Sequence, residues 1–454
     1  MQRIFYRSTN KKSSLVSFKD ALLKGQASDF GLYVPISIPK LTKMEIESFK
    51  DKEYYEIAFD VVKKFLQDEI DEEDLRKLTK EAYDFNIPLE RIEDNLFIMR
   101  LDKGPTASFK DFAARLMARL MHYFAKKENN KLTVLVATSG DTGGAVADAF
   151  YGLKNIEVTV LFPEKEVSII QRKQMTTLGK NIKALAVKGT FDDCQALVKQ
   201  AFNDKDLKRL NLTSANSINF GRLMPQIVYY FYAYSRIGKN KIIFSVPSGN
   251  FGNLMGGVIA REMGLNVEKF IVAVNENDEF SVFLNKGSYK PVEPSRKCSS
   301  NAMNVGHPSN LARLIDLYGG WIYDKRNEEG KIIKKGILKK KPDMKKLRKD
   351  FASFSITDEE VDETIKRFYA KYGKLLEPHG AIAWCALEKY AKSNKISAAV
   401  SLETADPAKF PDKINKLLGI KPKIPKSLAG LDRKKEHFEV IKNNYKDFKN
   451  KLLR

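Results

Sequence analysis

Two glycine-containing turns carry residue types that are suited to binding anions. Residues 137–144 read ATSGDTGG and residues 246–253 read VPSGNFGN, and each turn lies between a short apolar run and a helical pattern. Glycines at such a turn let an oxyanion approach the backbone N–H groups of the following helix, whose N-terminus carries partial positive charge. Each turn alone is a weak signal, because similar turns are often purely structural. Together they predict two anion pockets.

A third turn places a lysine at the start of a helical pattern. Residues 104–112 read GPTASFKDF, so that Lys110 opens an amphipathic segment. A helix N-terminus disfavours a cation, and a lysine that loses its proton easily is suited to Schiff-base chemistry. A solvated lysine at a helix start is the alternative interpretation.

The amine, a phosphate cradle and a second anion pocket together indicate pyridoxal phosphate. The chief rival is a dinucleotide site. It is not supported, because the chain has neither GxGxxG followed by a suitably spaced acid nor a GxxxxGK[ST] loop. No metal ligand set is expected.

Short apolar runs alternate with helical patterns through the part of the chain that holds these turns. Strands that lack polar alternation and are separated by helices favour an α/β core with a largely parallel sheet covered on both faces. The expected strands are residues 96–99, 133–137, 158–162, 182–187, 242–246, 271–274 and 398–402. The expected helices are residues 112–124, 142–151, 191–202, 223–235, 254–263 and 381–391.

Residues 1–95 have a different pattern, with one strand-like piece at residues 3–6 and an amphipathic helix at residues 54–66. We therefore expect an N-terminal, mostly helical domain over 1–95 and a catalytic core over 96–454. Lysine runs in residues 324–350 predict a basic, solvated connection or insertion. Residues 419–425 predict a linker before a final basic helix.

The length and composition exclude several classes of protein. The 454 residues are enough for two or three domains, and 43% hydrophobic with 30% charged residues is ordinary for soluble globular proteins. The longest apolar stretches, such as residues 381–387, are far shorter than the ~20 residues of a membrane helix. The N-terminus has no apolar signal core.

The formal charge of +22 arises from 79 basic and 57 acidic residues. Nucleic-acid binding, attraction of an anionic small ligand and a merely lysine-rich surface all explain such a surplus. Cys194, Cys298 and Cys385 are far apart and odd in number, which argues against a disulfide framework or a structural zinc site. A reducing, cytoplasmic location is expected.

Further short motifs occur one after another along almost the whole chain. They are YRST at 6–9, ALLKG at 21–25, GLYVP at 31–35, QMTT at 174–177, FDDCQ at 191–195, SANSIN at 214–219, NEND at 275–278 and HPSN at 307–310. With the three turns, they resemble the threonine synthase family, within the fold-type II group of pyridoxal-phosphate enzymes. Serine dehydratases and cysteine synthases share that fold but not these strings.

The resemblance implies a fold-type II core of two parallel-sheet α/β subdomains, the smaller over about residues 126–215. It implies a lyase that converts O-phospho-L-homoserine and water to L-threonine and phosphate by γ-elimination and β-replacement, the last step of threonine biosynthesis. It implies no nucleic-acid or membrane partner, and a monomer or homodimer.

The resemblance also implies roles for individual residues. Lys110 would carry the cofactor and move protons, and Asp141 would lie near the phenolic oxygen of the cofactor. Thr404 would lie at its ring nitrogen. The cofactor phosphate would be held by Gly249, Asn250, Phe251, Gly252 and Asn253. The substrate would be held by Ser139, Gly140 and Thr142 at its carboxylate and by Asn216, Ser217 and Arg222 at its phosphate.

Three positions depart from the family pattern. Lys103 and Asp406 stand where the family usually has histidine, and residues 29–31 read DFG where a second glycine is commoner. Asp406 would either alter the electronics of the cofactor ring or cap the next helix, and we favour the cap. His122, His307, His379 and His437 are expected to be structural or surface groups, His379 being the first to examine.

Two other functions stay open at this point. A phospholyase that stops after elimination and releases 2-oxobutyrate needs the same lysine and phosphate contacts, so product analysis is required to distinguish it. A basic nucleic-acid-binding protein is the alternative from a different class. Its lysine runs lack interleaved aromatic residues for base stacking, and salt-dependent oligonucleotide titration would test it.

Overall fold

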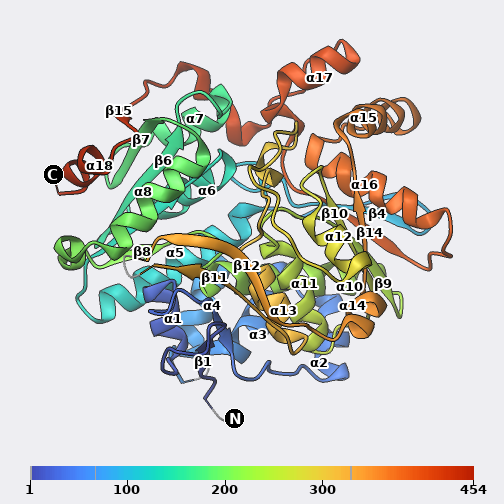
Figure 1. Cartoon of the computed structure of the whole chain (residues 1–454). Helices are drawn as coiled ribbons and strands as arrows, with labels where there is room; N and C mark the ends of the chain where they lie inside the picture. Colours follow the sequence, from blue (N-terminus) through green and yellow to red (C-terminus); the bar gives the residue numbers. More distant parts are fainter. Residues whose placement is uncertain (1–2, 67, 328–329, 454) are drawn as a thin grey trace.

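The larger of two α/β sheets lies on one side of the molecule (Figure 1). The computed structural model describes residues 3–66, 68–327 and 330–453. The six strands have the order β13-β10-β9-β14-β4-β3 and are parallel except for the antiparallel edge pair β3–β4. In that order they are Phe351–Ser355, Val267–Val274, Ile242–Pro247, Ala399–Glu403, Leu96–Arg100 and Leu89–Glu93. Strand β3 falls within the predicted N-terminal domain (1–95) in sequence and pairs with β4 at the edge of the larger sheet.

The smaller sheet has five strands in the order β15-β7-β6-β5-β8, and every neighbouring pair is parallel. In that order they are Glu439–Lys442, Ile182–Lys188, Ile156–Pro163, Leu132–Ala137 and Leu212–Ser214. The apolar runs predicted as strands are confirmed. The sequence missed β15, because only Ile441 of its four residues is buried and its partner β7 is distant in the chain.

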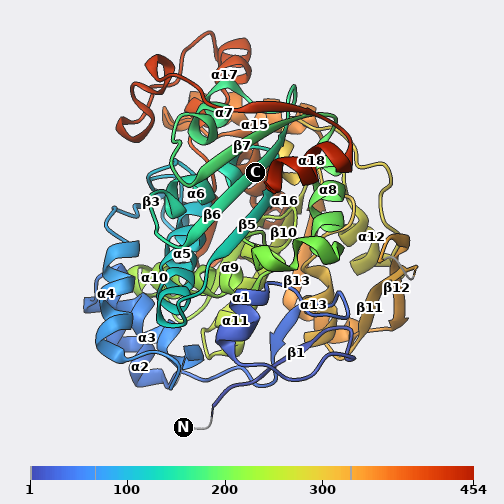
Figure 2. The same cartoon turned by 90° about the vertical axis from the view of Figure 1, so that its left-hand side faces the viewer.

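Helices cover both sheets, as Figure 2 shows. Helices α6 and α7 pack together beside the smaller sheet, and α8 packs on β5 and β6, whereas α16 packs on β9, β10 and β14. The bounds are α5 Lys110–Lys127, α6 Asp141–Phe150, α7 Ile169–Thr176, α8 Phe191–Asn203, α11 Gly252–Glu262, α12 Glu279–Lys286, α13 Leu311–Leu317, α15 Asp358–Tyr372 and α16 Pro378–Ala391. The predicted α/β architecture is therefore confirmed.

One predicted helix is divided. Residues 223–235 form the end of α9 (Phe220–Leu223), the 3-10 turn η3 (Met224–Ile227) and most of α10 (Val228–Ile237). Pro225 lies at the start of η3 and has no N–H to donate, so a regular helix does not run through it. All of these residues up to Phe231 are buried.

The N-terminal region is mostly helical, as predicted. It contains α1 Phe18–Lys24, α2 Lys43–Ser48, η1 Phe49–Asp51, α3 Tyr54–Leu66 and α4 Glu72–Ala82. The strand predicted at residues 3–6 instead lies at β1 (Tyr6–Ser8), because it pairs there with the distant β2 (Tyr33–Pro35). Helix α3 packs on α10 and α4 on α5, which joins this region to the larger core.

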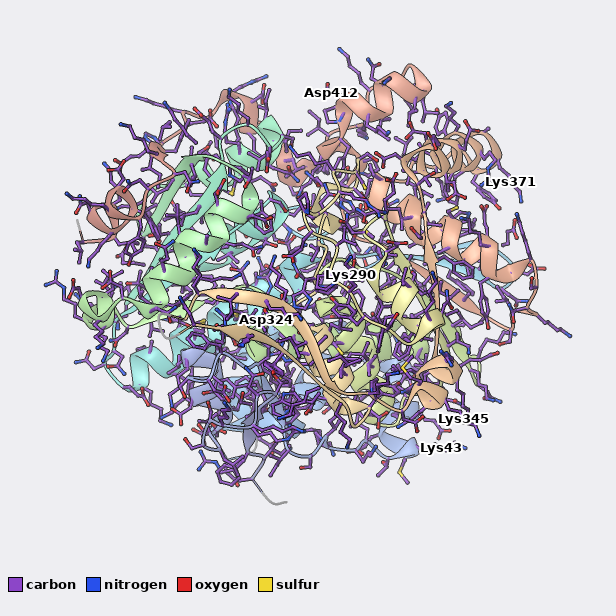
Figure 3. All side chains as sticks on the ribbon, viewed as in Figure 1. Lys43, Lys290, Asp324, Lys345, Lys371 and Asp412 are labelled. Carbon is purple, nitrogen blue, oxygen red and sulfur yellow. The ribbon has the colours of Figure 1, made fainter. Side chains whose placement is uncertain are left out.

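The basic segment 324–350 is more ordered than predicted. β11 (Trp321–Arg326) and β12 (Ile332–Lys340) form an antiparallel ribbon, and α14 (Met344–Asp350) follows. Within the described residues its lysines are exposed except for the half-buried Lys335, as expected for a solvated face. Figure 3 shows Lys345 at the periphery together with Lys43 and Lys371.

The C-terminal segment returns from the larger subdomain to the smaller one (Figure 2). It runs through η5 (Pro407–Lys409), α17 (Pro411–Leu418), η6 (Lys426–Leu428) and η7 (Leu431–Arg433) to β15 and α18 (Tyr445–Leu452). Residues 420–425 have no regular structure, as predicted for a linker, and α18 is the predicted basic helix. No helix in the described ranges is long and apolar enough to cross a membrane.

Candidate active site

A cavity of about 110 Å³ lies between the two subdomains. The turns that follow β5, β9 and β14 line it, together with the start of α5. Ligands collect at the carboxyl ends of strands in parallel sheets, where helix N-termini face the cavity. All of the site residues predicted from sequence line this cavity except Gly140, whose backbone forms the turn.

Lys110 is the first residue of α5, and hydrogen bonds to the end of β14 fix the preceding loop. The Phe109 N–H donates to the Thr404 carbonyl at 2.9 Å, and the Asp406 N–H donates to the Ala107 carbonyl at 3.1 Å. Phe109 gives α5 no side-chain cap. Lys110 and Thr404, nearly 300 residues apart in the chain, are thereby brought to the same cavity.

Burial is the main reason that the pKa of Lys110 falls to about 8. The positive charges of Arg222 and Lys409 lower this pKa further, whereas Asp141 and Glu377 raise it. The sequence predicted a lowered proton affinity from the position of Lys110 at a helix N-terminus, whereas burial is the largest cause in the folded protein. A large fraction of the amine is therefore unprotonated near pH 8 and able to act as a nucleophile or base.

Asp111 shapes the turn that precedes Lys110. Its carboxylate accepts from the Thr106 N–H at 2.9 Å and from the Thr106 hydroxyl at 2.5 Å. A Cβ atom on Gly104 would lie 2.4 Å from Asp111 Oδ2, so only glycine fits there. Burial raises the pKa of Asp111 to about 6.

The turn between β5 and α6 is built around the Thr138 hydroxyl. It accepts from the N–H groups of Gly140 and Gly143 at 2.9 and 2.8 Å. Gly140 has φ +136°, and a Cβ atom there would lie 2.4 Å from Gln171 Cδ. Ser139 and Thr142 line the cavity beside the N-terminus of α6.

Asp141 begins α6 and is held from two other elements. Its Oδ1 accepts from Gln171 Nε2 at 3.1 Å and from Lys409 Nζ at 2.9 Å. Lys409 and Lys110 hold the pKa of the Asp141 carboxyl near 2 despite its burial. The sequence analysis missed Lys409, although it lies only five residues after Thr404.

The turn between β9 and α11 has the form of an anion cradle. Phe251, at the N-cap of α11, adopts the left-handed conformation at φ +62° and gives the helix no side-chain cap. Asn253 closes the turn by donating to the Pro247 carbonyl at 2.8 Å. A Cβ atom on Gly249 would lie 2.9 Å from the Ala302 carbonyl oxygen, so glycine is required for this close approach.

Three residues in or just after the HPSN motif hold in place the turn at Asn250 and the loop at Ser217. The Asn310 amide donates to the carbonyls of Asn250 at 3.0 Å and Ser217 at 3.2 Å. The Ser309 hydroxyl donates to Asn250 Oδ1 at 3.0 Å, and Arg313 Nη1 donates to the Ser217 carbonyl at 3.0 Å. The sequence singled out this motif only through the resemblance.

Arg222 presents a buried guanidinium with free donors to the cavity. Its side chain is 2% exposed, and both Nη1 and Nη2 are without a hydrogen-bond partner. Burial lowers its pKa to about 10. Buried polar groups in folded proteins are almost always paired, so two free guanidinium nitrogens indicate a missing anion. Asn216 and Ser217 line the same cavity.

Thr404 is backed by a buried pair of carboxyl groups. Its hydroxyl donates to Glu377 Oε1 at 3.3 Å, and Glu377 Oε2 lies 2.5 Å from Nδ1 of His379. Glu403 accepts from the Glu377 N–H at 3.0 Å, and burial raises the Glu403 pKa well above its ordinary value. His379 also lines the cavity, so it is a site residue as well as a structural one.

The two residues that depart from the family pattern contact each other. Lys103 Nζ lies 3.1 Å from Asp406 Oδ2 and 2.8 Å from Asp102 Oδ2. Asp406 also caps η5, because its carboxylate accepts from the Ala408 N–H at 3.0 Å. The predicted cap is confirmed. The other departure, residues 29–31, forms a turn with Phe30 at φ +62° and with the Asp29 side chain accepting from the Gly31 N–H.

The donors of the cavity fit an anionic cofactor that carries a carbonyl group. Three helices begin at the cavity without a side-chain cap from the residue at the N-cap position, one lysine has a lowered pKa, and one arginine has free donors. Among the described residues no cluster of three potential metal ligands occurs. A larger cavity of about 360 Å³ adjoins the first and shares Asn216, Ser217 and Asn250 with it, which gives a substrate room to reach Lys110.

Comparison with known proteins identifies matches along almost the whole chain. Residues 5–83 match the family described as threonine synthase N terminus, residues 86–402 match pyridoxal-phosphate dependent enzymes, and residues 380–451 match threonine synthase, C-terminal. Curated threonine synthases are similar to the chain. The protein of Buchnera aphidicola from Acyrthosiphon pisum is 40% identical over 91% of each chain, and that of Escherichia coli is 37% identical over 91% of each.

Solved structures give the same result for the fold. The threonine synthase of Brucella melitensis with bound pyridoxal phosphate has a TM-score of 0.90 and 36% identity, and covers 99% of this chain and 98% of its own. The Escherichia coli threonine synthase has a TM-score of 0.87 and 34% identity over 99% of both chains.

Proposed function

The chain belongs to the threonine synthase family, and we propose that it converts O-phospho-L-homoserine and water into L-threonine and phosphate. Its cofactor is pyridoxal phosphate. The observation that carries the proposal is the meeting of Lys110 with the unpaired guanidinium of Arg222 in one cavity, at the N-termini of α6 and α11. The amine of Lys110 suits the carbonyl group of the cofactor. The guanidinium and the helix N–H groups suit the phosphates of cofactor and substrate and the carboxylate of the substrate.

Each group of residues has a separate task in this proposal. The N–H groups from Gly249 to Asn253 would hold the phosphate of the cofactor, Thr404 would lie at its ring nitrogen, and Asp141 would lie near its phenolic oxygen. Ser139, Thr142 and the turn at Gly140 bind the substrate carboxylate. Arg222 binds the substrate phosphate with Asn216 and Ser217, because a guanidinium contacts two oxygens at once.

Lys110 has two tasks. Its amine would hold the cofactor until the substrate amine replaces it, and the freed amine would then take the proton from Cα of the substrate. The bound cofactor withdraws electrons from the substrate and so stabilises negative charge on its carbon atoms. A proton then leaves Cβ, phosphate leaves Cγ and Cγ gains a proton. The hydroxyl of water then adds at Cβ while Cα regains a proton, so the three protons released by Cα, Cβ and water are taken up by Cγ, Cα and phosphate. The sum is substrate plus water to threonine plus phosphate.

The proposed function is tested with purified protein loaded with pyridoxal phosphate. Borohydride should fix the cofactor to Lys110, as peptide mass mapping would detect, and O-phospho-L-homoserine should yield equal amounts of phosphate and threonine. Cofactor-loaded protein that releases no phosphate would contradict the assignment. Formation of 2-oxobutyrate in place of threonine would instead identify a phospholyase.

Lys110→Ala should abolish both borohydride fixation and turnover. Loss of the only proposed base should lower kcat by ~1,000-fold or more. Cofactor content after reduction and phosphate release are the two measurements. A variant that kept wild-type turnover would refute the role of Lys110.

Three further statements belong to the same proposal. The chain divides into a threonine-synthase-like N-terminal domain over 1–95 and a catalytic core over 96–454, with the smaller subdomain at about 126–215 and the basic insertion at about 324–350. It works as a monomer or homodimer in the cytoplasm. The free thiols of Cys194, Cys298 and Cys385 support a reducing compartment.

A further inference from the structure

Lys409 is a fully buried cation outside the set of residues that touch the cavity. Its side chain is 0% exposed, and its ammonium lies 2.9 Å from Asp141 Oδ1. An isolated buried ammonium is costly, so a lysine in such a place needs a charged partner. The partner here is a residue that lines the active site.

The Lys409–Asp141 ion pair joins the two subdomains. Asp141 begins α6 beside the smaller sheet, whereas Lys409 ends η5, just after β14 of the larger sheet. The backbone around η5 is itself fixed, because the Asp406 N–H donates to Ala107 and the Lys409 N–H donates to Asp406. The ammonium is therefore presented to Asp141 from a rigid segment.

The bonds to Asp141 leave the carboxylate with one free oxygen. Gln171 and Lys409 both contact Oδ1, and no described side chain donates to Oδ2. Asp141 lines the cavity with Lys110, so the free oxygen is the part of the carboxylate available to a ligand there. The orientation of this oxygen depends on Lys409 and Gln171.

We propose that Lys409 is a positioning residue for the reaction, acting through Asp141: its buried ammonium keeps the Asp141 carboxylate charged and oriented beside Lys110. This inference rests on the proposed function. It assigns a role to a residue that touches neither substrate nor cofactor. It also explains how a carboxylate is kept beside a cofactor that carries negative charge, because Lys409 neutralises it.

The charged groups around the pair give the direction of the expected effects. Asp141 faces Lys409 and Lys110, Lys110 also faces Arg222 and Glu377, and Lys409 also acts on Asp111. The Asp141 pKa is lowered to about 2, with Lys409 the largest lowering cause, so loss of Lys409 raises it. The acid limb of the activity profile should then move to higher pH. Loss of the same charge also raises the pKa of Lys110 while Asp141 is still ionised.

The test uses holoenzyme with pyridoxal phosphate, comparing wild type with Lys409→Met, Lys409→Arg and the double variant Asp141→Asn/Lys409→Met. In Lys409→Met, kcat should fall ~10-fold or more while KM changes by less than ~3-fold. The acid limb of kcat and the pH transition of the visible cofactor band should both rise by about one pH unit. Lys409→Arg should keep the acid limb of kcat within ~0.5 pH unit of wild type, because arginine keeps the positive charge.

The matched control is Lys103→Met. Lys103 pairs with Asp406 on the same segment but not with Asp141, so its loss weakens the tether of the segment without removing the partner of Asp141. In Lys103→Met, the pH transition of the visible cofactor band should occur at the same pH as in wild type. An equal shift in Lys103→Met, or a wild-type spectrum and pH profile in Lys409→Met, would overturn the proposal.

The double variant keeps the test decisive where Lys409→Met fails to fold, since it removes both charges and leaves no lone buried ion. In an Asp141→Asn background, adding Lys409→Met should change kcat by less than ~3-fold if Lys409 acts through Asp141. A further ~10-fold loss would refute the proposal. The cofactor spectrum is recorded without substrate. An enzyme that released no phosphate would contradict the proposed function, but its spectrum would still test the role of Lys409.

Discussion

At the scale of single residues, two buried arginines show opposite bonding states. Arg222 is 2% exposed with both Nη atoms free, whereas Arg313 is 1% exposed and donates to Tyr33, Ser217, Ile218 and Asn310. Burial lowers the pKa of Arg222 to about 10 and that of Arg313 to about 9. The guanidinium of Arg222 is therefore free to bind a ligand, whereas that of Arg313 fixes the loops around the site.

Arg222→Met should separate activity from stability. Removing an unpaired buried charge should leave the free energy of unfolding within ~1 kcal/mol of wild type or raise it. The kcat/KM for the phosphorylated substrate should fall ~100-fold or more, because a charged contact to phosphate is lost. Thermal unfolding of the protein and initial rates of phosphate release are the measurements.

Arg313→Met is the matched control for this prediction. It leaves several buried carbonyl groups without donors, so the protein should lose ~3 kcal/mol or more. A strongly destabilised Arg222→Met protein, or one with unchanged kcat/KM, would show that Arg222 has a structural partner rather than a ligand.

At the scale of elements, the turn between β5 and α6 depends on backbone geometry. Gly140 is the one predicted site residue that does not line the cavity, yet its φ of +136° lets the chain turn from the strand into the helix. The side chain closest to it is Gln171, which also orients Asp141. The role of Gly140 is therefore to place Ser139, Asp141 and Thr142.

Gly140→Ala should destabilise the protein by ~3 kcal/mol or more and weaken cofactor binding, because a Cβ atom would overlap Gln171 as well as strain the backbone. Gly152→Ala is the control. Gly152 has φ +74° with nothing within 4 Å of an added Cβ, so strain alone should cost ~1 kcal/mol. Chemical unfolding and cofactor titration measure both effects. Equal losses in the two variants would rule out the overlap with Gln171.

At the scale of the whole molecule, the C-terminal segment completes the smaller subdomain. β15 pairs with β7, Arg172 pairs with Glu436 at 3.0 Å, and Tyr445 donates to Asp204 at 2.6 Å. Phe448 is 0% exposed and packs in the same apolar cluster as Ile441. The stability of the smaller subdomain therefore depends on residues far from it in sequence.

Phe448→Ala should lower the free energy of unfolding by ~3–4 kcal/mol, since it leaves a cavity under β7 and α8. Val440→Ala is the matched control on β15, because Val440 is 45% exposed and should cost less than ~0.5 kcal/mol. Denaturant unfolding measures both values. A Phe448→Ala protein as stable as the control would show that α18 contributes little to this core.

The +22 charge also belongs to the scale of the whole molecule. Most lysines of the ribbon and α14 are exposed, and the labelled Lys43, Lys345 and Lys371 lie at the periphery in Figure 3. Among the described residues that line the cavity, Lys110 and Arg222 are the only lysine and arginine. Most of the surplus is therefore a charged surface, and the two cations in the cavity are those that matter for anionic ligands.

The sequence by itself predicted the features that depend on neighbours in the chain. Apolar runs and glycine turns indicated the strands, the helices and the anion-binding loops, and the lysine at a helix start indicated the reactive amine. These are local signals, because a turn or a helix start is defined within a few residues. The family resemblance supplied the remaining site residues, and almost all of them line one cavity.

The tertiary structure decided everything that depends on distant partners. Sequence gave no reason to pair Lys409 with Asp141, residues 268 apart, or to leave Arg222 without a partner. It likewise missed β15, whose four residues form a strand only because β7 offers an unpaired edge. The lowered pKa of Lys110 arises mainly from burial, which exists only after the subdomains close around it. Desolvation and long-range pairing are properties of the folded chain, and no local pattern encodes them.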